Sequence, residues 1–184
     1  PRRPGPARAA LDAGARAIND VSGLSDPSVA RLVAEHDAGV ILMANPSTPR
    51  SRTAATPIAT VRALLQGCLE RARAAGIPDE RVVLDPGIGY FRGERLAWPV
   101  WDLQVLADLE ALAELGRPLC VGVSRKSFIG EITGRTATDD RLPGSLAATT
   151  MAVLNGAALI RAHDVAETLD AVRVAERLRR ATRG

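Results

Sequence analysis

The sequence predicts an α/β fold built on parallel strands, and three observations support this prediction. Short apolar runs alternate with longer amphipathic stretches along the whole chain, in the order expected for strands that are each followed by a helix. The apolar runs are continuous rather than alternating with polar residues, as in sheets that are covered on both faces. Each segment between two apolar runs is long enough for the crossover that joins parallel strands.

Five strands are expected, each followed by a helix. The strands are placed at residues 17–18 continuing into 19–21, and at 40–43, 81–84, 118–123 and 158–161. The helices are placed at 7–13, 28–36, 58–75, 101–115 and 144–155, and a last helix ends near residue 180. Ser25 or Asp26 followed by Pro27 is a typical helix start. No linker or low-complexity segment interrupts this order, which indicates one domain over residues 1–184.

Composition limits the classes of function. The 184 residues are 46% apolar, which excludes a predominantly disordered chain, and the lack of any run of about 20 apolar residues argues against a membrane span. The net charge is only +3, the basic residues are spread out and aromatic residues make up 3%, so no nucleic-acid partner is expected. Cys68 and Cys120 lie far apart in apolar surroundings and are expected to be reduced core thiols of a cytoplasmic protein.

Polar side chains follow the carboxyl ends of all five predicted strands. They are Asn19, Asn45, Asp85, Ser124 with Lys126, and Arg161 with His163. Parallel α/β folds build their sites at this edge of the sheet. A single polar residue after a strand means little, but here polar residues follow all five strands and include carboxylate, amide, ammonium, guanidinium and imidazole groups. We therefore expect the functional site there.

Each of these residues also has a structural interpretation. Asp85 precedes Pro-Gly and is either an acceptor that points into the site or a turn former. Lys126 and Arg161 are either a phosphate site or solvated surface cations, and His163 would face the same side as Arg161 if the strand continues. Asn19 either recognises the edge of a heterocycle or forms an Asn-Asp turn. The glycine spacing matches neither a dinucleotide fingerprint nor a Walker A loop, and no residue set has metal-ligand spacing.

Five segments taken together resemble dihydropteroate synthase, in that family's order and with roughly its spacings. They are residues 15–23 (ARAINDVSG), 84–89 (LDPGIG), 121–130 (VGVSRKSFIG), 141–147 (RLPGSLA) and 160–165 (IRAHDV). The resemblance implies a TIM (β/α)8 barrel of the pterin-binding type. It also implies a transferase of folate biosynthesis that joins 6-hydroxymethyl-7,8-dihydropterin pyrophosphate to p-aminobenzoate and releases pyrophosphate with the assistance of Mg²⁺.

The resemblance further implies roles for individual residues. Asn19 and Asp85 would hydrogen-bond the pterin ring, Met43 would line its pocket, and Arg161 with His163 would hold the pyrophosphate and stabilise the charge that develops as it leaves. Tyr90 and Ser127 would lie near the aminobenzoate. The implied substrate-binding residues are Asn19, Met43, Asp85, Tyr90, Gly122, Lys126, Ser127, Arg161 and His163, and the implied catalytic residues are Lys126, Arg161 and His163. No metal ligand is assigned, because Mg²⁺ is expected to bind mainly through the substrate pyrophosphate and residues outside this chain. A homodimer is expected for the full-length protein.

The chain departs from the family pattern in two loops and at its beginning. Ala44 and Ser47 stand where the family usually has His and Gly, and Phe91, after Tyr90, stands where it usually has Gly. Similar Gly-aromatic-Phe runs occur in sulfonamide-insensitive members, so altered sulfonamide sensitivity is expected. About the first three strand–helix units are expected to be absent, which predicts an incomplete barrel with weak or no activity. Two alternatives stay open: a non-catalytic pterin-binding barrel homologue, and a pterin-dependent methyltransferase, which is not expected to keep Ser-Arg-Lys and Arg-x-His.

Overall fold

The computed structural model describes residues 1–46, 56–92 and 96–183, and within these ranges the strands form two parallel groups. One sheet contains β1 (Ala17–Asp20), β2 (Gly39–Met43) and β3 (Val82–Asp85) in that order, and β4 (Cys120–Val121) pairs with β5 (Leu159–Ile160). A parallel bridge between Leu84 and Leu119 joins β3 to the segment that leads into β4. The N–H of Leu84 donates to the Pro118 carbonyl at 2.9 Å across the same junction.

The strand prediction is confirmed in direction and in order. Each described strand lies beside the one that precedes it in the chain, and all pairs are parallel. A doubly wound sheet reverses its strand order at a switch point, whereas this row does not. The last two strands are shorter than the predicted 118–123 and 158–161, because β4 and β5 pair with each other over only two residues in each strand.

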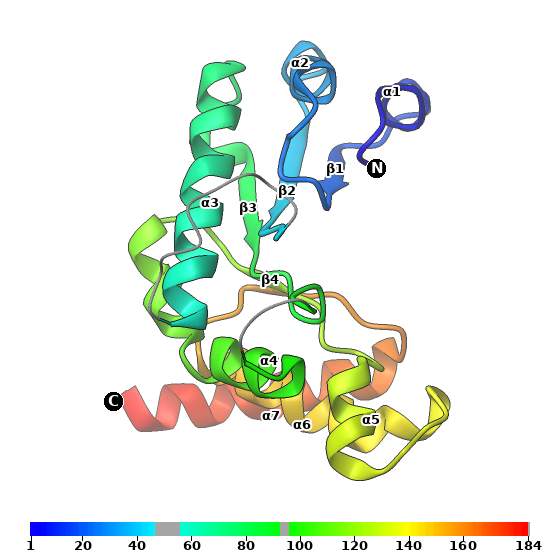
Figure 1. Ribbon diagram of the computed structural model, residues 1–184, viewed down its shortest axis with the longest axis vertical. Coiled ribbons are helices and arrows are strands. Elements are labelled where there is room, and N and C mark those ends of the chain that lie inside the picture. Colours follow the sequence, from blue (N-terminus) through cyan, green and yellow to red (C-terminus); the bar gives the residue numbers. More distant parts are fainter. Residues whose placement is uncertain (47–55, 93–95, 184) are drawn as a thin grey trace.

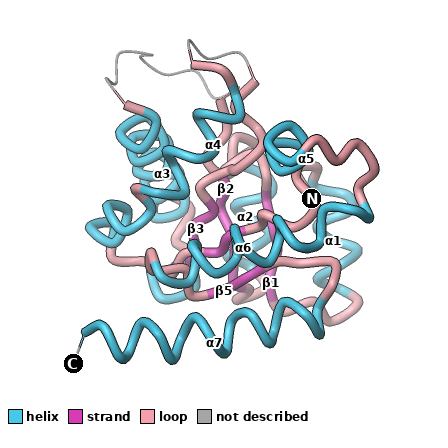
Figure 2. Tube along the Cα trace, turned by 90° about the horizontal axis from the view of Figure 1, so that it is seen from below, coloured by secondary structure: helices cyan, strands magenta, loops and turns pink. Residues whose placement is uncertain are grey.

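The helices lie on one side of this row of strands and follow its curve (Figure 1). They are α1 (Pro4–Asp12), α2 (Pro27–Glu35), α3 (Pro57–Ala74), α4 (Trp98–Ala107), α5 (Ser127–Thr133), α6 (Leu142–Leu154) and α7 (Val165–Arg183). Short 3-10 helices stand at η1 (Asp79–Arg81), η2 (Leu109–Leu115) and η3 (Asp139–Arg141). Figure 2 shows the strands in the middle of the molecule, with α7 along its border. None of the helices in the described ranges is both long and apolar enough to cross a membrane.

Local chemistry explains where the helices begin. Proline occupies the first turn of α1, α2, α3, α4 and α6, where its missing N–H costs no hydrogen bond. Asp26 caps α2 by accepting the N–H of Ser28 at 2.9 Å, which confirms one of the two predicted caps. Thr56 caps α3 by accepting the N–H of Ala59 at 3.3 Å.

Two helix predictions were wrong. The helix expected at 101–115 starts earlier, at Trp98, because Pro99 suits a first turn, and it breaks at Asp108 into the 3-10 helix η2. Helix α5 was not predicted at all. Its seven residues are too few for a periodic pattern, and it begins after Lys126 without any side-chain cap.

The core lies between the strands and the helices that cover them. Ile18, Val40, Leu42 and Leu84 are almost completely buried and belong to one continuous apolar cluster. Cys68 and Cys120 are both buried free thiols, as predicted, and burial raises the pKa of the Cys120 thiol to about 11. The opposite face of the strands carries polar residues, among them Asn19 and Asp85.

Candidate active site

Strand periodicity places the predicted site residues on one face of the sheet. Met43 is paired with Asp85 across β2 and β3, and Asn19 is paired with Ile41, which lies two residues before Met43. Residues two apart in a strand share a face, so Asn19, Met43 and Asp85 face the same way. Their neighbours Ile18, Leu42 and Leu84 therefore face the apolar core.

The same parity continues through the last two strands. The Leu84–Leu119 bridge brings Cys120 level with Asp85, and the pair Val121–Ile160 is followed by Gly122 and Arg161. Cys120, Gly122 and Arg161 consequently share the face of Asp85. The electrostatic effect of Asp85 and Arg161 on the Cys120 thiol agrees with this placement.

Asp85 is the buried anion of the site. Its side chain is 4% exposed, and its Oδ1 accepts the N–H of Gly87 at 2.8 Å, so the residue also forms the turn that its Pro-Gly context suggested. Burial raises the pKa of Asp85, while the Gly87 N–H and the charges of Arg161 and Lys126 oppose this rise. One carboxylate thus lies within the field of two cations.

Arg161 lies flat against the backbone of Gly122. A Cβ at position 122 would stand 2.7 Å from Nη2 and 3.3 Å from Nε of Arg161, closer than side chains tolerate. A side chain at position 122 would therefore displace this guanidinium, and glycine leaves it room to lie against the backbone. The guanidinium borders a cavity of about 380 Å³. The cavity is lined by Gly122, Ser124, Arg125, Lys126, Thr138, Arg161, Ala162 and His163.

Ser124 connects the loop after β4 to the loop after β5. Its Oγ lies 3.0 Å from Nδ1 of His163 and accepts the N–H of the same residue at 3.2 Å. Ser124 is 8% exposed whereas His163 is exposed, so the serine holds the imidazole from its buried side. It fixes the imidazole at the cavity wall and leaves its Nε2 as the nitrogen not engaged by Ser124.

A second connection between these loops was not predicted from the sequence. Arg125 adopts a left-handed backbone with φ +59°, and its guanidinium binds Asp164 through two contacts of 3.1 Å and 2.5 Å. It also binds Asp139. Its N–H donates to Ser145 Oγ at 2.9 Å, and its carbonyl accepts from Arg141 at 3.1 Å. The sequence did contain a signal for this ion pair: Arg125 precedes Lys126 and Asp164 follows His163, so opposite charges lie next to two predicted site residues.

Lys126, Tyr90 and Ser127 lie at the rim. The Lys126 ammonium stands 4.9 Å from the centre of the Tyr90 ring, and Tyr90 is 40% exposed. Ser127 opens α5 and accepts a hydrogen bond from Arg92, which stacks on Trp98 at 3.9 Å. Lys126 is half-buried whereas Arg161 is exposed, so the phosphate site expected at these two cations stays a prediction.

Phe91 takes a different direction from Tyr90. It is 1% exposed and stacks on Trp101 with ring centres 5.0 Å apart and planes inclined by 21°. The residue that replaces the usual glycine thus enters the core, under the loop that carries Tyr90. Ser47 of the other departing loop lies outside the described residues.

Asn19 and Asn45 differ in their surroundings. The Oδ1 of Asn19 is buried and has no hydrogen-bond partner in the part of the chain that the structure describes. Such an acceptor on the site face is suited to a ligand donor. The amide of Asn45 instead donates to the Val21 carbonyl at 2.7 Å, so it braces the loop after β1.

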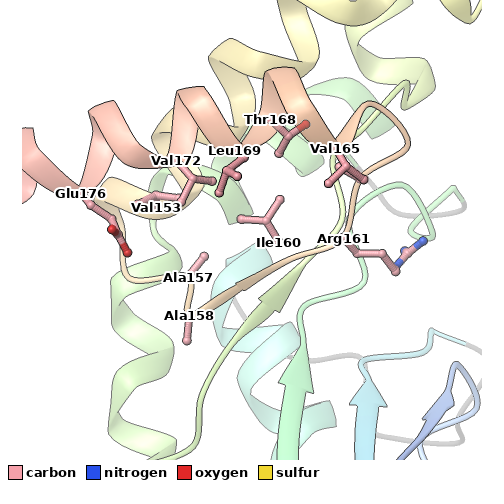
Figure 3. A pocket seen from close by; sticks show the side chains of 11 residues that line it. Val153, Ala157, Ala158, Ile160, Arg161, Val165, Thr168, Leu169, Val172 and Glu176 are labelled. Carbon is pink, nitrogen blue, oxygen red and sulfur yellow. The ribbon is translucent and has the colours of Figure 1, made fainter.

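A second cavity, of about 440 Å³, lies between β5 and α7 (Figure 3). Ile160, Leu169 and Val172 point into it, while the guanidinium of Arg161 points away from it. Its lining is mostly apolar, with Glu176 at one end, so it lacks the convergent polar groups of the first cavity.

Comparison with known proteins gives the family. The sequence pattern of the family described as pterin binding enzyme matches residues 2–163. A dihydropteroate synthase from Neisseria meningitidis serogroup B is 38% identical over 166 residues, which is 88% of this chain and 58% of that protein. One from Escherichia coli K12 is 36% identical over 92% of this chain and 59% of that protein.

Solved structures agree with the sequence relatives. A dihydropteroate synthase from Xanthomonas albilineans, in complex with 7,8-dihydropteroate, superposes with a TM-score of 0.86 at 39% identity, over 97% of this chain and 64% of that one. The chain therefore spans about three fifths of the length of the curated relatives it matches. A family match over residues 2–163, an α/β fold shared with solved dihydropteroate synthases and identities of 36–39% to these relatives show that this chain belongs to the pterin-binding enzyme family.

Proposed function

We propose that this chain carries the pterin-binding and pyrophosphate-binding part of a dihydropteroate synthase. The observation that supports this most directly is the shared face: a buried carboxylate, Asp85, stands beside a cavity bordered by Lys126, Arg161 and His163. A ring with N–H donors fits the carboxylate, and a polyanion fits the cations. The relatives named above are synthases, and one of them is solved with 7,8-dihydropteroate.

The proposed reaction assigns a role to each group. The amine nitrogen of p-aminobenzoate attacks the methylene carbon of the pterin pyrophosphate, and the carbon–oxygen bond breaks with its electron pair leaving on the pyrophosphate. The attacking amine then gives up a proton. Lys126, Arg161 and His163 stabilise the charge that grows on the departing oxygen, since they are held in place before the reaction begins. Asn19 and Asp85 hold the pterin, and Met43, which is 1% exposed, forms an apolar wall beside Asp85.

We assign no Mg²⁺ ligand within the described residues. They contain no cluster of three or more His, Cys, Asp or Glu side chains that could hold a metal ion, and the cavity is lined by cations. The magnesium expected from the family therefore has no ligand set in the described part of the chain, and no step above depends on it.

We place β1–β5 in a (β/α)8 barrel within one domain over residues 1–184, which is supported by their sequential parallel order. We assign a homodimer to the full-length protein, supported by Met151 and Val174, which expose 45% and 60% of their surface on α6 and α7. The two buried free thiols favour the cytoplasm.

Altered sulfonamide sensitivity belongs to the same proposal. The proposal is supported by Phe91, whose buried ring stacks on Trp101 and anchors the loop of Tyr90 in the core, which a glycine at this position could not do. The inhibition constant of sulfamethoxazole for the full-length enzyme tests this, and ordinary sensitivity would contradict it.

Calorimetric titration with pterin pyrophosphate, followed by a turnover assay with p-aminobenzoate, tests the main proposal. We expect binding by this chain with weak or no turnover, and turnover by the full-length protein. Replacing Lys126 or Arg161 by Ala in the full-length enzyme should lower the rate about 10²-fold, as when one preorganised donor is removed. Tight binding without turnover at full length would favour the non-catalytic homologue, and a change below about threefold would make these residues surface cations.

A further inference from the structure

Asp102 is a buried carboxylate that the proposed chemistry does not use. It lies on α4 and is 1% exposed. Its Oδ1 accepts the N–H of Gly89 at 2.8 Å, while its Oδ2 is buried and has no hydrogen-bond partner among residues 1–46, 56–92 and 96–183. Burying a carboxylate is costly unless charge or hydrogen bonds compensate, and an apolar residue would fill the same space without that cost. The buried carboxylate of Asp102 is therefore expected to have a role beyond packing.

Lys126 lies against Gly89, the residue whose N–H Asp102 accepts. A Cβ at position 89 would stand 3.1 Å from Cδ and 3.3 Å from Nζ of Lys126, so the lysine side chain lies against this glycine. Its ammonium also stands over the Tyr90 ring. The backbone that supports Lys126 is thus the same backbone whose N–H is held by Asp102.

The electrostatics point the same way. Burial lowers the pKa of Lys126, and the charges of Arg161 and Arg92 lower it further, while Asp85 and Asp102 raise it. Conversely, burial raises the pKa of Asp102, and the Gly89 N–H, Arg92 and Lys126 oppose that rise. Each of the two groups therefore favours the charged form of the other.

We propose that Asp102 is a positioning residue for Lys126: its carboxylate fixes the Gly89 backbone against which the lysine side chain lies. This inference rests on the proposed function, because it gives Lys126 its purpose at the pyrophosphate. It extends that function to a residue on a helix behind the loop, which touches no substrate.

Lys126 is the only lysine in the 184-residue sequence, so its titration is directly measurable. Protein labelled with ¹³C in lysine Cε gives one lysine signal, whose shift against pH reports the pKa of Lys126. Asp102→Asn keeps an oxygen acceptor for Gly89 and removes the charge. We expect the pKa of Lys126 to fall in this variant. Asp108→Asn removes an exposed charge from the end of the same helix and should leave the titration unchanged.

An unchanged Lys126 titration in a folded Asp102→Asn protein overturns the proposal, as does an equal shift in Asp108→Asn. Circular dichroism verifies folding. Should Asp102→Asn not fold, the wild-type protein gives a second measurement: the carboxyl carbon of Asp102 should shift as Lys126 loses its proton. A carboxyl signal that does not move across that transition overturns the proposal equally.

A binding assay distinguishes the role of Lys126 at the pyrophosphate from the role of Asp102 in positioning Lys126. If Lys126→Ala leaves the affinity for pterin pyrophosphate unchanged, the assigned role of Lys126 fails, whereas the titration still decides whether Asp102 positions it. If Lys126→Ala weakens binding, Asp102→Asn should weaken it too, and should add nothing in the Lys126→Ala background. Equal effects of Asp102→Asn in both backgrounds would show that it does not act through Lys126.

Discussion

Gly122→Ala should damage the anion site without damaging the fold. The new Cβ would stand 2.7 Å from Nη2 of Arg161, whereas ordinary contacts begin at 3.4 Å, so the guanidinium must move by about 0.7 Å. It cannot move into the backbone of β4, so it shifts toward the cavity that the pyrophosphate is proposed to fill. Displacements of about 1 Å can cost about 10²-fold in a positioned site.

The expected loss of affinity follows from the interaction that is displaced. A hydrogen bond to a charged group contributes about 1.5–3 kcal/mol, which corresponds to about 10- to 100-fold in a dissociation constant. Titration calorimetry with inorganic pyrophosphate at fixed ionic strength measures it. Gly122 has no left-handed backbone, so alanine should also stabilise the folded chain through the unfolded state by about 0.4–1 kcal/mol. Urea denaturation should therefore show little net loss.

Gly5→Ala is the matched control. A Cβ at Gly5 would meet nothing within 4 Å, and this residue lies in the first turn of α1, away from the site face. Its pyrophosphate affinity should equal that of the wild type. Unchanged affinity in Gly122→Ala would refute the assignment of Arg161 to the anion. A loss of affinity accompanied by an equal loss of folded protein would refute the claim that only the site is affected.

Three further substitutions are expected to change the stability of the fold, and one of them also changes pterin binding. Burial raises the pKa of Asp85, so ionisation of this carboxyl opposes folding increasingly as the pH rises above its pKa in the unfolded chain, about 3.9. Asp85→Asn should therefore raise the urea midpoint at pH 7, and this gain should disappear toward pH 4. The same substitution should weaken pterin binding about tenfold or more. The hydrogen bond from Arg125 holds the pKa of Asp164 below its usual range, so this pair stabilises the fold above pH about 4 and loses that effect as the pH falls further. When the pH is lowered below about 4, the urea midpoint of Asp164→Asn should therefore fall less than that of the wild type. Phe91→Ala should cost about 3–5 kcal/mol of unfolding free energy in urea, because it empties a buried aromatic site, and a loss below about 1 kcal/mol would contradict the stacking assigned to it.

Local patterns predicted the order and the parallel direction of the strands, whereas the function of the face that carries Asp85 stays a prediction. A run such as Val82–Asp85 carries its own signal, because a buried strand must be apolar and its carboxyl end must reach the site edge. Asp85, Gly122 and Arg161 could be placed at strand ends from single segments. The parity that brings them together depends on the register between strands, which only the paired structure contains.

Interactions between distant segments account for what the sequence did not predict. Arg125 and Asp164 are separated by 39 residues, and neither lies in a pattern that requires the other. Asp102 looks like one polar position on a helix, because the Gly89 N–H that it accepts belongs to another loop. The predicted 101–115 helix breaks at Asp108, where the sequence has neither Gly nor Pro to mark the break.

The two cations of the proposed anion site share one structural device. Arg161 lies on Gly122 and Lys126 lies on Gly89, and in each case the space for a Cβ is taken by the long side chain of a neighbouring loop. A flexible side chain loses rotamer freedom when it is held, and contact with a rigid backbone supplies that restraint before any ligand binds. Sequence reasoning treats glycine at such positions as a turn former, which holds for Gly89 with its φ of +85°. At Gly122 the backbone is ordinary, so its requirement for glycine comes from the guanidinium alone, and the glycine is as much a part of the site as the cation that lies on it.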